Sequence, residues 1–252
     1  MNQAGPQLGV VEVLAAVGSA ARALDVGCGS GRVAVALAER GAEVTGLDSN
    51  ARPLAELERR ARGAGVEVRA VQADMDETLP FADDRFDCAV SRLSLMIARE
   101  PEATLRELAR VVEPGGAVVT AVWAEQSANP WFTEPRTAVA AALGPHRAAF
   151  ARVFGRLGEM AELEQLHRTA GLVDVSAQVL TDQLRPASAA EHWDRLSQQI
   201  GHFRRLRETL TQDEAAALGA ELERRLAPYQ EDGALALRRT MLLVAARVAE
   251  AA

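Results

Sequence analysis

The chain has 252 residues, of which 48% are hydrophobic, so a packed globular protein is expected rather than a disordered one. Its formal net charge is −7, and it contains no lysine, because every basic side chain apart from four histidines is an arginine. The acidic balance argues against a nucleic-acid partner, which needs clustered positive charge. The missing lysine excludes Schiff-base chemistry, which needs a lysine amine.

The chain shows no secretory signal peptide and no apolar run long enough to cross a bilayer. We therefore expect a cytoplasmic protein without a membrane partner. Its two cysteines, Cys28 and Cys88, fall in predicted core segments and are expected to be reduced thiols, although a disulfide between them stays open. The sequence does not determine the oligomeric state, and a homodimer also stays open.

The first half of the chain alternates between predicted strands and predicted helices. A short amphipathic helix is expected over residues 8–17. Strands are predicted at 22–26, 43–47, 66–71, 86–90 and 117–123. Helices are predicted at 31–40, 51–63 and 101–112, with a turn at 113–116. Strands that alternate with helices in this way predict βαβ units and a parallel sheet.

After Trp123 the pattern changes. A polar loop is predicted at 127–135, and residues 138–170 are mostly helical in pattern. A strand follows at 171–180, then a helical insertion over 187–229 that is broken near Thr211 and Pro228, and a final strand at 235–248. No linker of low complexity separates the two halves, so one domain with a helical cap is expected rather than two independent domains.

The segment 23–32 reads as a buried strand that turns through glycines into a helix. Its glycines, Gly27, Gly29 and Gly31, have the spacing G-x-G-x-G, and Arg32 stands where a dinucleotide motif would have its third glycine. A turn of this kind brings bare backbone amides against a ligand, and we expect the three glycines to permit that approach without a Cβ clash.

Acidic residues follow the next two strands. Asp48 ends the second strand, where a carboxylate can accept hydrogen bonds from both hydroxyls of a ribose. Its alternative role is to cap the helix from 51 onward, which Ser49 could do equally well. Asp74 follows the third strand and begins an acidic segment that ends in Leu79-Pro80-Phe81. Taken alone, this segment could be an acidic surface loop.

The ordered set of the glycine loop, Asp48, Asp74, Phe86-Asp87 and Pro114-Gly115-Gly116 resembles the class I methyltransferases that use S-adenosylmethionine (SAM). It is most similar to their small-molecule branch, methyltransferase type 11, which includes enzymes of ubiquinone and menaquinone biosynthesis. The resemblance covers about residues 23–124. It implies an α/β fold, with a Rossmann-like, seven-stranded, mostly parallel sheet, helices on both faces and a helical cap inserted before the last strand.

The resemblance also implies how the chain is divided. It predicts a single methyltransferase domain over 1–252, with a SAM-binding half at 1–124 and an acceptor-side half at 125–252. The last two strands would form an antiparallel pair at the sheet edge. The helical insertion at about 187–230 would serve as a lid over the carboxyl ends of the strands.

The cofactor that the resemblance implies is S-adenosyl-L-methionine, and no metal is expected. Asp25 would hold the glycine loop and lie near the amino group of the cofactor, and Ser91 would face the methyl donor. Asp74 would accept a hydrogen bond from the adenine amino group, with the Met75 amide nearby, while Phe86-Asp87 would be structural. The full set of predicted cofactor residues is Asp25, Gly27, Cys28, Gly29, Gly31, Asp48, Ser49, Asp74, Met75 and Ser91.

The methyl group of SAM is already activated, so the protein mainly has to align an acceptor and exclude water. A general base helps when the acceptor is a hydroxyl or an acidic carbon. We favour His202 as this base because its neighbours are apolar. His167 is predicted to be a solvated surface residue and His146 to start a helix, and a structural role is open for every histidine.

Three tryptophans, Trp123, Trp131 and Trp193, are candidates to line an apolar acceptor pocket. Trp123 fits a core position equally well. Trp131, in a predicted polar loop, is harder to explain as core. Residues 91–94 lack the Asn/Asp-Pro-Pro-Tyr element of enzymes that methylate the amines of bases, which argues against that reaction.

The sequence therefore predicts a SAM-dependent methyltransferase that acts on an O or C atom of a small, largely apolar metabolite. An alternative is a relative that binds SAM or S-adenosylhomocysteine (SAH) without transferring a methyl group and works as a regulator or a cyclase. A nicotinamide oxidoreductase is a third hypothesis, and both Arg32 and the acidic segment at Asp74 argue against it.

Overall fold

The computed structural model describes residues 8–151 and 155–250. The chain forms two compact units. The first, called the sheet unit below, comprises Met1–Ala124, Leu157–Leu180 and Met241–Ala252. The second, called the helical unit, comprises Glu125–Arg156 and Thr181–Thr240. Two later segments of the chain thus return to the sheet unit.

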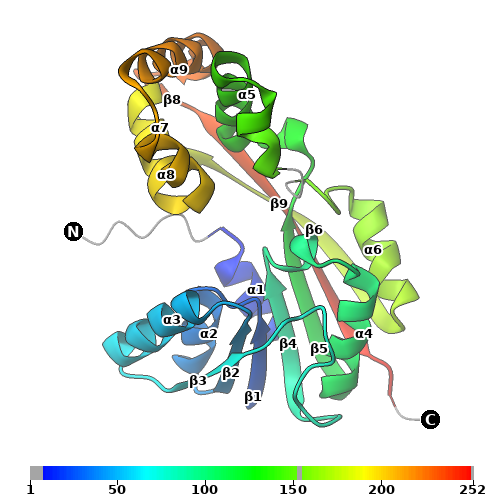
Figure 1. Ribbon diagram of the computed structural model, residues 1–252. Helices are drawn as coiled ribbons and strands as arrows, with labels where there is room; N and C mark the ends of the chain where they lie inside the picture. The colour runs from blue at the N-terminus through cyan, green and yellow to red at the C-terminus, as the bar shows by residue number, and fades with distance from the viewer. Residues whose placement is uncertain (1–7, 152–154, 251–252) are drawn as a thin grey trace. The chain divides into compact units, whose positions relative to one another are not determined.

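A seven-stranded sheet forms the centre of the sheet unit, in the order β3-β2-β1-β4-β5-β9-β6 (Figure 1). Neighbouring strands from β3 to β5 pair in parallel, and β9 pairs with β5 in the antiparallel direction. The expected seven-stranded, mostly parallel sheet is thus confirmed. The strands are β1 (Arg22–Val26), β2 (Glu43–Asp48), β3 (Val68–Gln72), β4 (Phe86–Arg92), β5 (Val112–Trp123), β6 (Leu172–Leu184) and β9 (Leu237–Val248).

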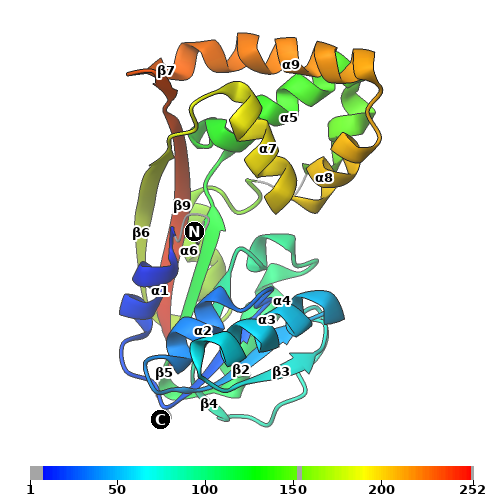
Figure 2. The ribbon, with the colours of Figure 1, turned by 90° about the vertical axis from the view of Figure 1, so that its left-hand side faces the viewer.

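Helices cover both faces of this sheet, as Figures 1 and 2 show. On one face α1, α2 and α3 pack in sequence against one another, and on the other α4 packs against α6. Each helix buries an apolar stripe at helical spacing; in α4 the side chains of Leu105, Leu108 and Val111 are fully buried. Burial of each such side chain stabilises the fold by about 1.5–3 kcal/mol. The helices are α1 (Val10–Val17), α2 (Arg32–Ala38), α3 (Ala51–Ala64), α4 (Pro101–Val111) and α6 (Met160–Thr169).

Asp87 ties the start of β1 to β4. Its carboxylate accepts hydrogen bonds from the backbone amides of Ala21 and Arg22, at 2.7 and 2.8 Å. The Arg22 guanidinium also donates to Asp87, at 2.6 and 2.8 Å, and reaches Glu113 at 2.6 Å. Charge-assisted bonds of this kind are stronger than neutral ones, and the structural role expected for Phe86-Asp87 fits this position.

The helical unit is built around α5 (Pro130–Leu143), which packs along α9 (Gln212–Leu226). The two helices α7 (Ala189–Gln199) and α8 (Gly201–Glu208) pack against each other, and α7 also contacts α9. The predicted break near Thr211 is the start of α9, where Thr211 and Glu214 form a capping box. The remaining elements are short: η2 (Gln126–Ala128), η3 (Pro145–Ala151), η4 (Ala227–Tyr229), β7 (Gln230–Glu231) and β8 (Ala234–Leu235).

The polar loop predicted at 127–135 is wrong, because α5 begins at Pro130. Proline suits this first helical position, where its missing N–H is not needed. The polar residue before it, Asn129, is fully buried. Its amide group donates to the carbonyls of Glu125 and Thr240, and its Oδ1 accepts from the backbone amide of Thr240 and from Nε1 of Trp131. A satisfied buried amide therefore replaces the expected solvated loop.

Other differences from the predicted elements are smaller. The turn expected at 113–116 lies inside β5, where the pairing with β4 shifts register between Phe86 and Cys88. The helical insertion is also broken at Ile200, which separates α7 from α8. Within the part of the chain that the structure describes, no helix combines the length and the apolar character needed to cross a membrane.

Candidate functional site

The glycine loop joins β1 to α2, and its three glycines all have positive φ angles: 66° at Gly27, 53° at Gly29 and 76° at Gly31. A Cβ atom at Gly27 would lie 2.2 Å from Cβ of Ser94, and one at Gly31 would lie 2.6 Å from Cγ of Leu57. A Cβ at Gly29 would meet no atom within 4 Å. At Gly27 and Gly31 the missing Cβ therefore makes room for the protein itself, and of the three glycines only Gly29 borders open space. The ligand contact expected of these glycines stays a prediction.

Asp25 holds the start of α2 from below the loop. It is 2% exposed, and its Oδ2 accepts a hydrogen bond from the backbone amide of Ala34 at 3.0 Å. The residue at the N-cap of α2 is Gly31, which has no side chain to cap the helix, so Asp25 satisfies one of its free amides instead. Burial raises the pKa of Asp25 to about 7, and the hydrogen bond from Ala34 only partly opposes this rise.

Asp48 holds the loop from its other side. Its Oδ2 accepts from the backbone amide of Gly29 at 3.0 Å, and its Oδ1 accepts from the amide of Asn50 at 2.9 Å. The N-cap of α3 is Asn50, which makes no capping bond through its side chain, so neither Asp48 nor Ser49 is the N-cap of this helix. Ser49 is exposed. Each carboxylate oxygen of Asp48 has a second lone pair and can still accept a further hydrogen bond.

Two buried hydroxyls connect the end of β4 to the end of β1. The Ser94 hydroxyl donates to the carbonyl of Val26 at 2.7 Å, so the Ser91 hydroxyl, 2.6 Å away, donates to Ser94. The backbone amide of Leu95 in turn donates to Ser91 at 3.1 Å. Ser91 is thus fully buried and its donor is used within the protein. The expectation that it faces the methyl donor has no support in this arrangement.

Cys28 and Cys88 are both buried and free, so the open disulfide is not formed. Burial raises the pKa of the Cys28 thiol well above its usual range, and that of Cys88 to about 12. Both therefore stay protonated. The Cys28 side chain packs toward Gly46 on β2, while its backbone amide donates to the Leu47 carbonyl at 3.0 Å. The backbone of Cys28 therefore joins the glycine loop to β2, and its predicted contact with the cofactor stays a prediction.

Asp74 lies after β3, at the same carboxyl edge of the sheet as the glycine loop and Asp48. Its Oδ1 accepts from the backbone amide of Asp76 at 3.0 Å, and its side chain is 40% exposed. The carbonyl of Met75 accepts from the Thr104 hydroxyl of α4 at 3.4 Å. The sheet therefore brings the predicted cofactor residues together at the carboxyl ends of β1 to β4, the usual position of a ligand on an open parallel sheet.

The sequence prediction for His167 is wrong. This histidine is fully buried, and its Nδ1 donates to the Leu163 carbonyl at 2.7 Å while its Nε2 lies 3.0 Å from Oγ1 of Thr120 on β5. Because a carbonyl only accepts, Nδ1 carries the proton, and Nε2 accepts from the threonine. Burial lowers the pKa of His167 to about 4. The spacing of Leu163 and His167, four residues apart on one helix face, was a signal for burial.

We expect His167 to make the protein sensitive to acid. The unfolded state takes up a proton near pH 6.5 and the folded state only near pH 4, so stability from this residue is complete above pH 6.5 and falls as the pH drops. Roughly 2 kcal/mol should be lost between pH 7.5 and pH 5. Urea unfolding of wild type and His167→Gln at both pH values checks this. The stability difference between them should shrink at pH 5, and an unchanged difference would refute the role. His146→Gln, at an exposed position, is the control.

His192 also has a structural role. Pro135 lies inside α5 and has no N–H for the carbonyl of Trp131, four residues earlier. His192 of α7 supplies the missing donor, because its Nε2 donates to the Trp131 carbonyl at 2.6 Å. Burial lowers the pKa of His192, which keeps the ring neutral. His146, by contrast, is exposed and lies at the start of η3, as expected.

His202, the predicted base, lies on α8 of the helical unit and is half-buried. Its Nε2 is 3.1 Å from the carbonyl of Arg147 and therefore donates to it. The lone pair that a base needs is then on Nδ1. The apolar setting expected for His202 is present, because its ring packs against that of Phe203, which is fully buried.

The three tryptophans belong to different units. Trp123 ends β5 in the sheet unit, whereas Trp131 and Trp193 belong to the helical unit. Trp131 is 6% exposed and packs on Phe132, and Trp193 makes an edge contact with Phe203. The placement of Trp131 in a polar loop is thus wrong, because it is a core residue of the helical unit.

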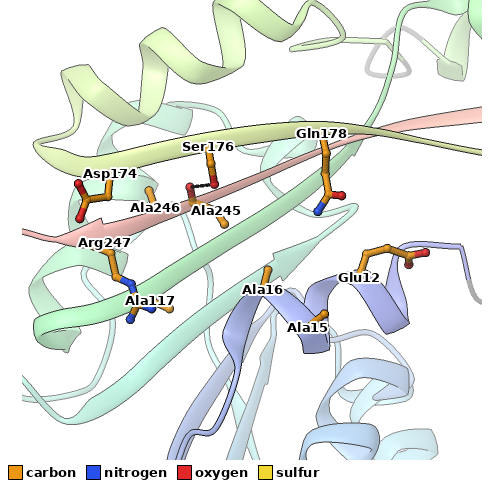
Figure 3. Close-up of a pocket in the computed structure, with 10 residues that line it drawn as sticks. All are labelled: Glu12, Ala15, Ala16, Ala117, Asp174, Ser176, Gln178, Ala245, Ala246 and Arg247. Atoms are coloured by element: carbon orange, nitrogen blue, oxygen red, sulfur yellow. Dashed lines mark hydrogen bonds between the residues drawn. The ribbon is translucent and has the colours of Figure 1, made fainter.

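A hollow of about 460 Å³ lies elsewhere in the sheet unit, between α1 and the strands β6 and β9 (Figure 3). Glu12, Ala15 and Ala16 line it from α1, and Ser176 on its far wall donates to the Ala245 carbonyl. Register places Ala117, another lining residue, level with Ala23 near the start of β1. The hollow is therefore toward the amino ends of the parallel strands, away from the glycine loop. Among the described residues, no group of histidine, cysteine and acidic side chains could hold a metal ion.

Residues 24–120 match a family model described as a methyltransferase domain. An uncharacterized protein of Mycobacterium tuberculosis is 37% identical over 117 residues, which cover 46% of this chain and 42% of the relative. A ubiquinone biosynthesis O-methyltransferase of Aeromonas salmonicida is 36% identical over 97 residues, which cover 38% of this chain and 41% of the relative. In both matches the chain spans about two fifths of the relative's length.

Solved structures share the fold over nearly the whole chain. A proposed methyltransferase of Bacillus halodurans has a TM-score of 0.62 at 19% identity, covering 96% of this chain and 99% of that one. A phosphoethanolamine N-methyltransferase of Haemonchus contortus, in complex with SAM, has a TM-score of 0.57 at 18% identity, covering 94% of this chain and 52% of that one. The cyclase SpnF has a TM-score of 0.58 at 21% identity, covering 95% and 80%. At these identities the likeness shows the fold alone.

Proposed function

Because residues 24–120 match a methyltransferase domain model and the chain shares its fold with a solved structure described as a methyltransferase, we propose that the protein is a SAM-dependent methyltransferase. Its acceptor would be an O or C atom of a small, largely apolar metabolite. The observation that carries the proposal is the glycine loop, in which Gly29 borders open space while its amide is held by Asp48. This gives a backbone surface that a ligand can approach, next to a fixed carboxylate.

The residues at the carboxyl edge of the sheet fit the parts of SAM. Asp48 retains lone pairs for the ribose hydroxyls, and the half-exposed carboxylate of Asp74 suits the adenine amino group. The role of Asp25 would be indirect, because it fixes the first turn of α2 and hence the conformation of the glycine loop. The bound cofactor would supply an electrophilic methyl group. The contribution of the protein is then to align the acceptor and exclude water.

The acceptor side rests on fewer observations. His202 is our candidate for the general base, and a base role would fall to its Nδ1, since Nε2 donates to Arg147. Trp123, Trp131 and Trp193 are the candidate acceptor contacts, and of these Trp123 is the last residue of β5, the strand that pairs with β4. The O-methyltransferase relative matches only 38% of the chain, so the acceptor class is our proposal.

We expect Asp48→Ala and Asp74→Ala each to weaken SAH binding, by roughly 10- to 100-fold, because each removes a charged hydrogen-bond acceptor. Isothermal titration of the purified protein with SAH measures the change. Glu43→Ala is the matched control, because it removes a carboxylate from the opposite end of the strand that carries Asp48. Affinity that is unchanged in both aspartate variants would rule out the assigned cofactor site.

A second candidate is binding of SAM or SAH without methyl transfer. In His167, His192 and His202 the Nε2 atom makes a contact within the protein and is not available as a general base, which favours this candidate. A cyclase also shares the fold. Incubation with methyl-deuterated SAM and a metabolite extract, followed by mass spectrometry, separates the two. A labelled product supports transfer and begins to identify the acceptor. SAM binding without any labelled product favours the second candidate.

A further inference from the structure

Arg99 lies between η1 (Leu95–Ile97) and α4 and binds the segment that follows β3. Its backbone amide donates to Oδ1 of Asp76 at 2.8 Å, and its Nε donates to Oδ2 of the same carboxylate at 3.0 Å. One residue thus holds both oxygens of Asp76, whose side chain is only 12% exposed. Such a two-point contact fixes the orientation of a carboxylate as well as its position.

The same pair of residues also determines the surroundings of Asp74. The Asp76 backbone amide donates to Oδ1 of Asp74 at 3.0 Å, and a terminal nitrogen of Arg99 lies 3.6 Å from Oδ2 of Asp74. Both oxygens of Asp74 are therefore approached by groups of the Asp76–Arg99 pair. A carboxylate held in this way offers hydrogen-bond acceptors to a ligand.

The far end of this segment is fixed independently by α4. Glu107 accepts from the backbone amide of Leu79 at 2.9 Å, and Arg110 donates to the carbonyls of Leu79 and Phe81 at 3.1 and 2.9 Å. Because these contacts hold residues 79–81, loss of the Arg99 contact would release the region around Asp74 without freeing the whole segment.

We infer that Asp76 and Arg99 are positioning residues, which aim the Asp74 carboxylate at the exocyclic amine of adenine and so make the site prefer adenine to a 6-oxopurine. This inference rests on the proposed cofactor site. The adenine amine donates a hydrogen bond to a carboxylate, whereas a 6-oxopurine presents a carbonyl oxygen there, and two acceptors repel. The preference requires a carboxylate held in one orientation, because a mobile one can turn away from the carbonyl.

The test compares SAH with its hypoxanthine analogue, in which a carbonyl replaces the adenine amine, by isothermal titration. Wild type should bind SAH more tightly, by roughly tenfold or more. In Arg99→Gln and Asp76→Asn, SAH affinity should fall by roughly tenfold while affinity for the analogue changes little, so the preference narrows. Arg99→Lys keeps the positive charge but loses the two-point contact. It should therefore recover part of the preference for SAH that Arg99→Gln loses. Arg106→Gln, which breaks an exposed ion pair with Glu102 on α4, should behave as wild type.

Three results would overturn the inference, and they are distinguishable. A preference that stays unchanged in Arg99→Gln and Asp76→Asn, with SAH still bound, would leave these residues a purely structural role. A wild-type protein that binds SAH and the analogue equally would show that Asp74 does not read the adenine amine. A wild-type protein that binds neither would overturn the proposed cofactor site, and the inference with it.

Discussion

Gly27→Ala is expected to destabilise the sheet unit by about 3 kcal/mol or more. The new Cβ would lie 2.2 Å from Cβ of Ser94, and the backbone φ of 66° is unfavourable for alanine. Overpacking of this kind costs about 1–3 kcal/mol and the left-handed conformation about 1–2 kcal/mol. The Ser94 side chain cannot move freely, because its hydroxyl donates a hydrogen bond to the carbonyl of Val26. Thermal unfolding followed by circular dichroism should show a Tm lower by roughly 6–12 °C.

Gly29→Ala is the matched comparison. It has the same kind of backbone, with φ of 53°, but no atom lies within 4 Å of the added Cβ. We expect only the conformational cost of about 1 kcal/mol, together with a loss of SAH affinity, since the methyl group would occupy the space proposed for the ligand. The double variant Gly27→Ala with Ser94→Gly should recover part of the stability lost by Gly27→Ala. Equal melting temperatures for the two alanine variants would contradict the packing role of Gly27.

Asp25→Asn is expected to make the protein more stable at pH 8, by on the order of 2 kcal/mol. The folded pKa of Asp25 is about 7 against an ordinary value of 3.8. Between these values the folded state keeps a proton that the unfolded state releases. Stability from this group is therefore complete below pH 4, declines as the pH rises, and is lost above pH 7. The total loss of folding stability is at most about 4 kcal/mol. The asparagine in the variant does not ionise, so the variant does not suffer this loss.

Denaturant unfolding of wild type and Asp25→Asn at pH 5 and pH 8 tests this. The advantage of the variant should grow with pH, and an advantage that is independent of pH would show that Asp25 does not titrate as proposed. His167 is present in both proteins, so its own titration cancels. Asp83→Asn, at an exposed carboxylate, is the control. The gain in stability should come with weaker SAH binding, since functional sites often retain unfavourable groups.

The sheet unit was predictable because its signals are local. Strands β1, β2, β4 and β5 each contain a run of buried residues, and β1 was predicted with its observed bounds, Arg22–Val26. The positions of Asp48 and Asp74 at strand ends followed from the same pattern. The roles of the glycines were not predictable, because they depend on Ser94 and Leu57, which are distant in sequence. A sequence motif of ten residues does not reveal which side chains from distant parts of the chain will pack against its turn.

The helical unit shows the same limit more strongly. The buried position of Asn129 depends on Thr240, 111 residues away, and His192 is fixed by a carbonyl that Pro135 leaves without a helical partner. Both residues are polar, and the polar type of Asn129 alone favoured a solvated loop. Their partners, not their own type, determine that they are buried.

The position of β9 in the sheet also has a consequence for how the protein is made. This strand lies between β5 and β6, yet it comes last along the chain. During synthesis β6 therefore leaves the ribosome without its neighbour, and the whole of Ala189–Tyr229 must follow before β9 can pair with β5. The sheet is completed only after translation has passed residue 240. Until then the nascent chain exposes an unpaired edge at β5, the kind of surface that chaperones cover.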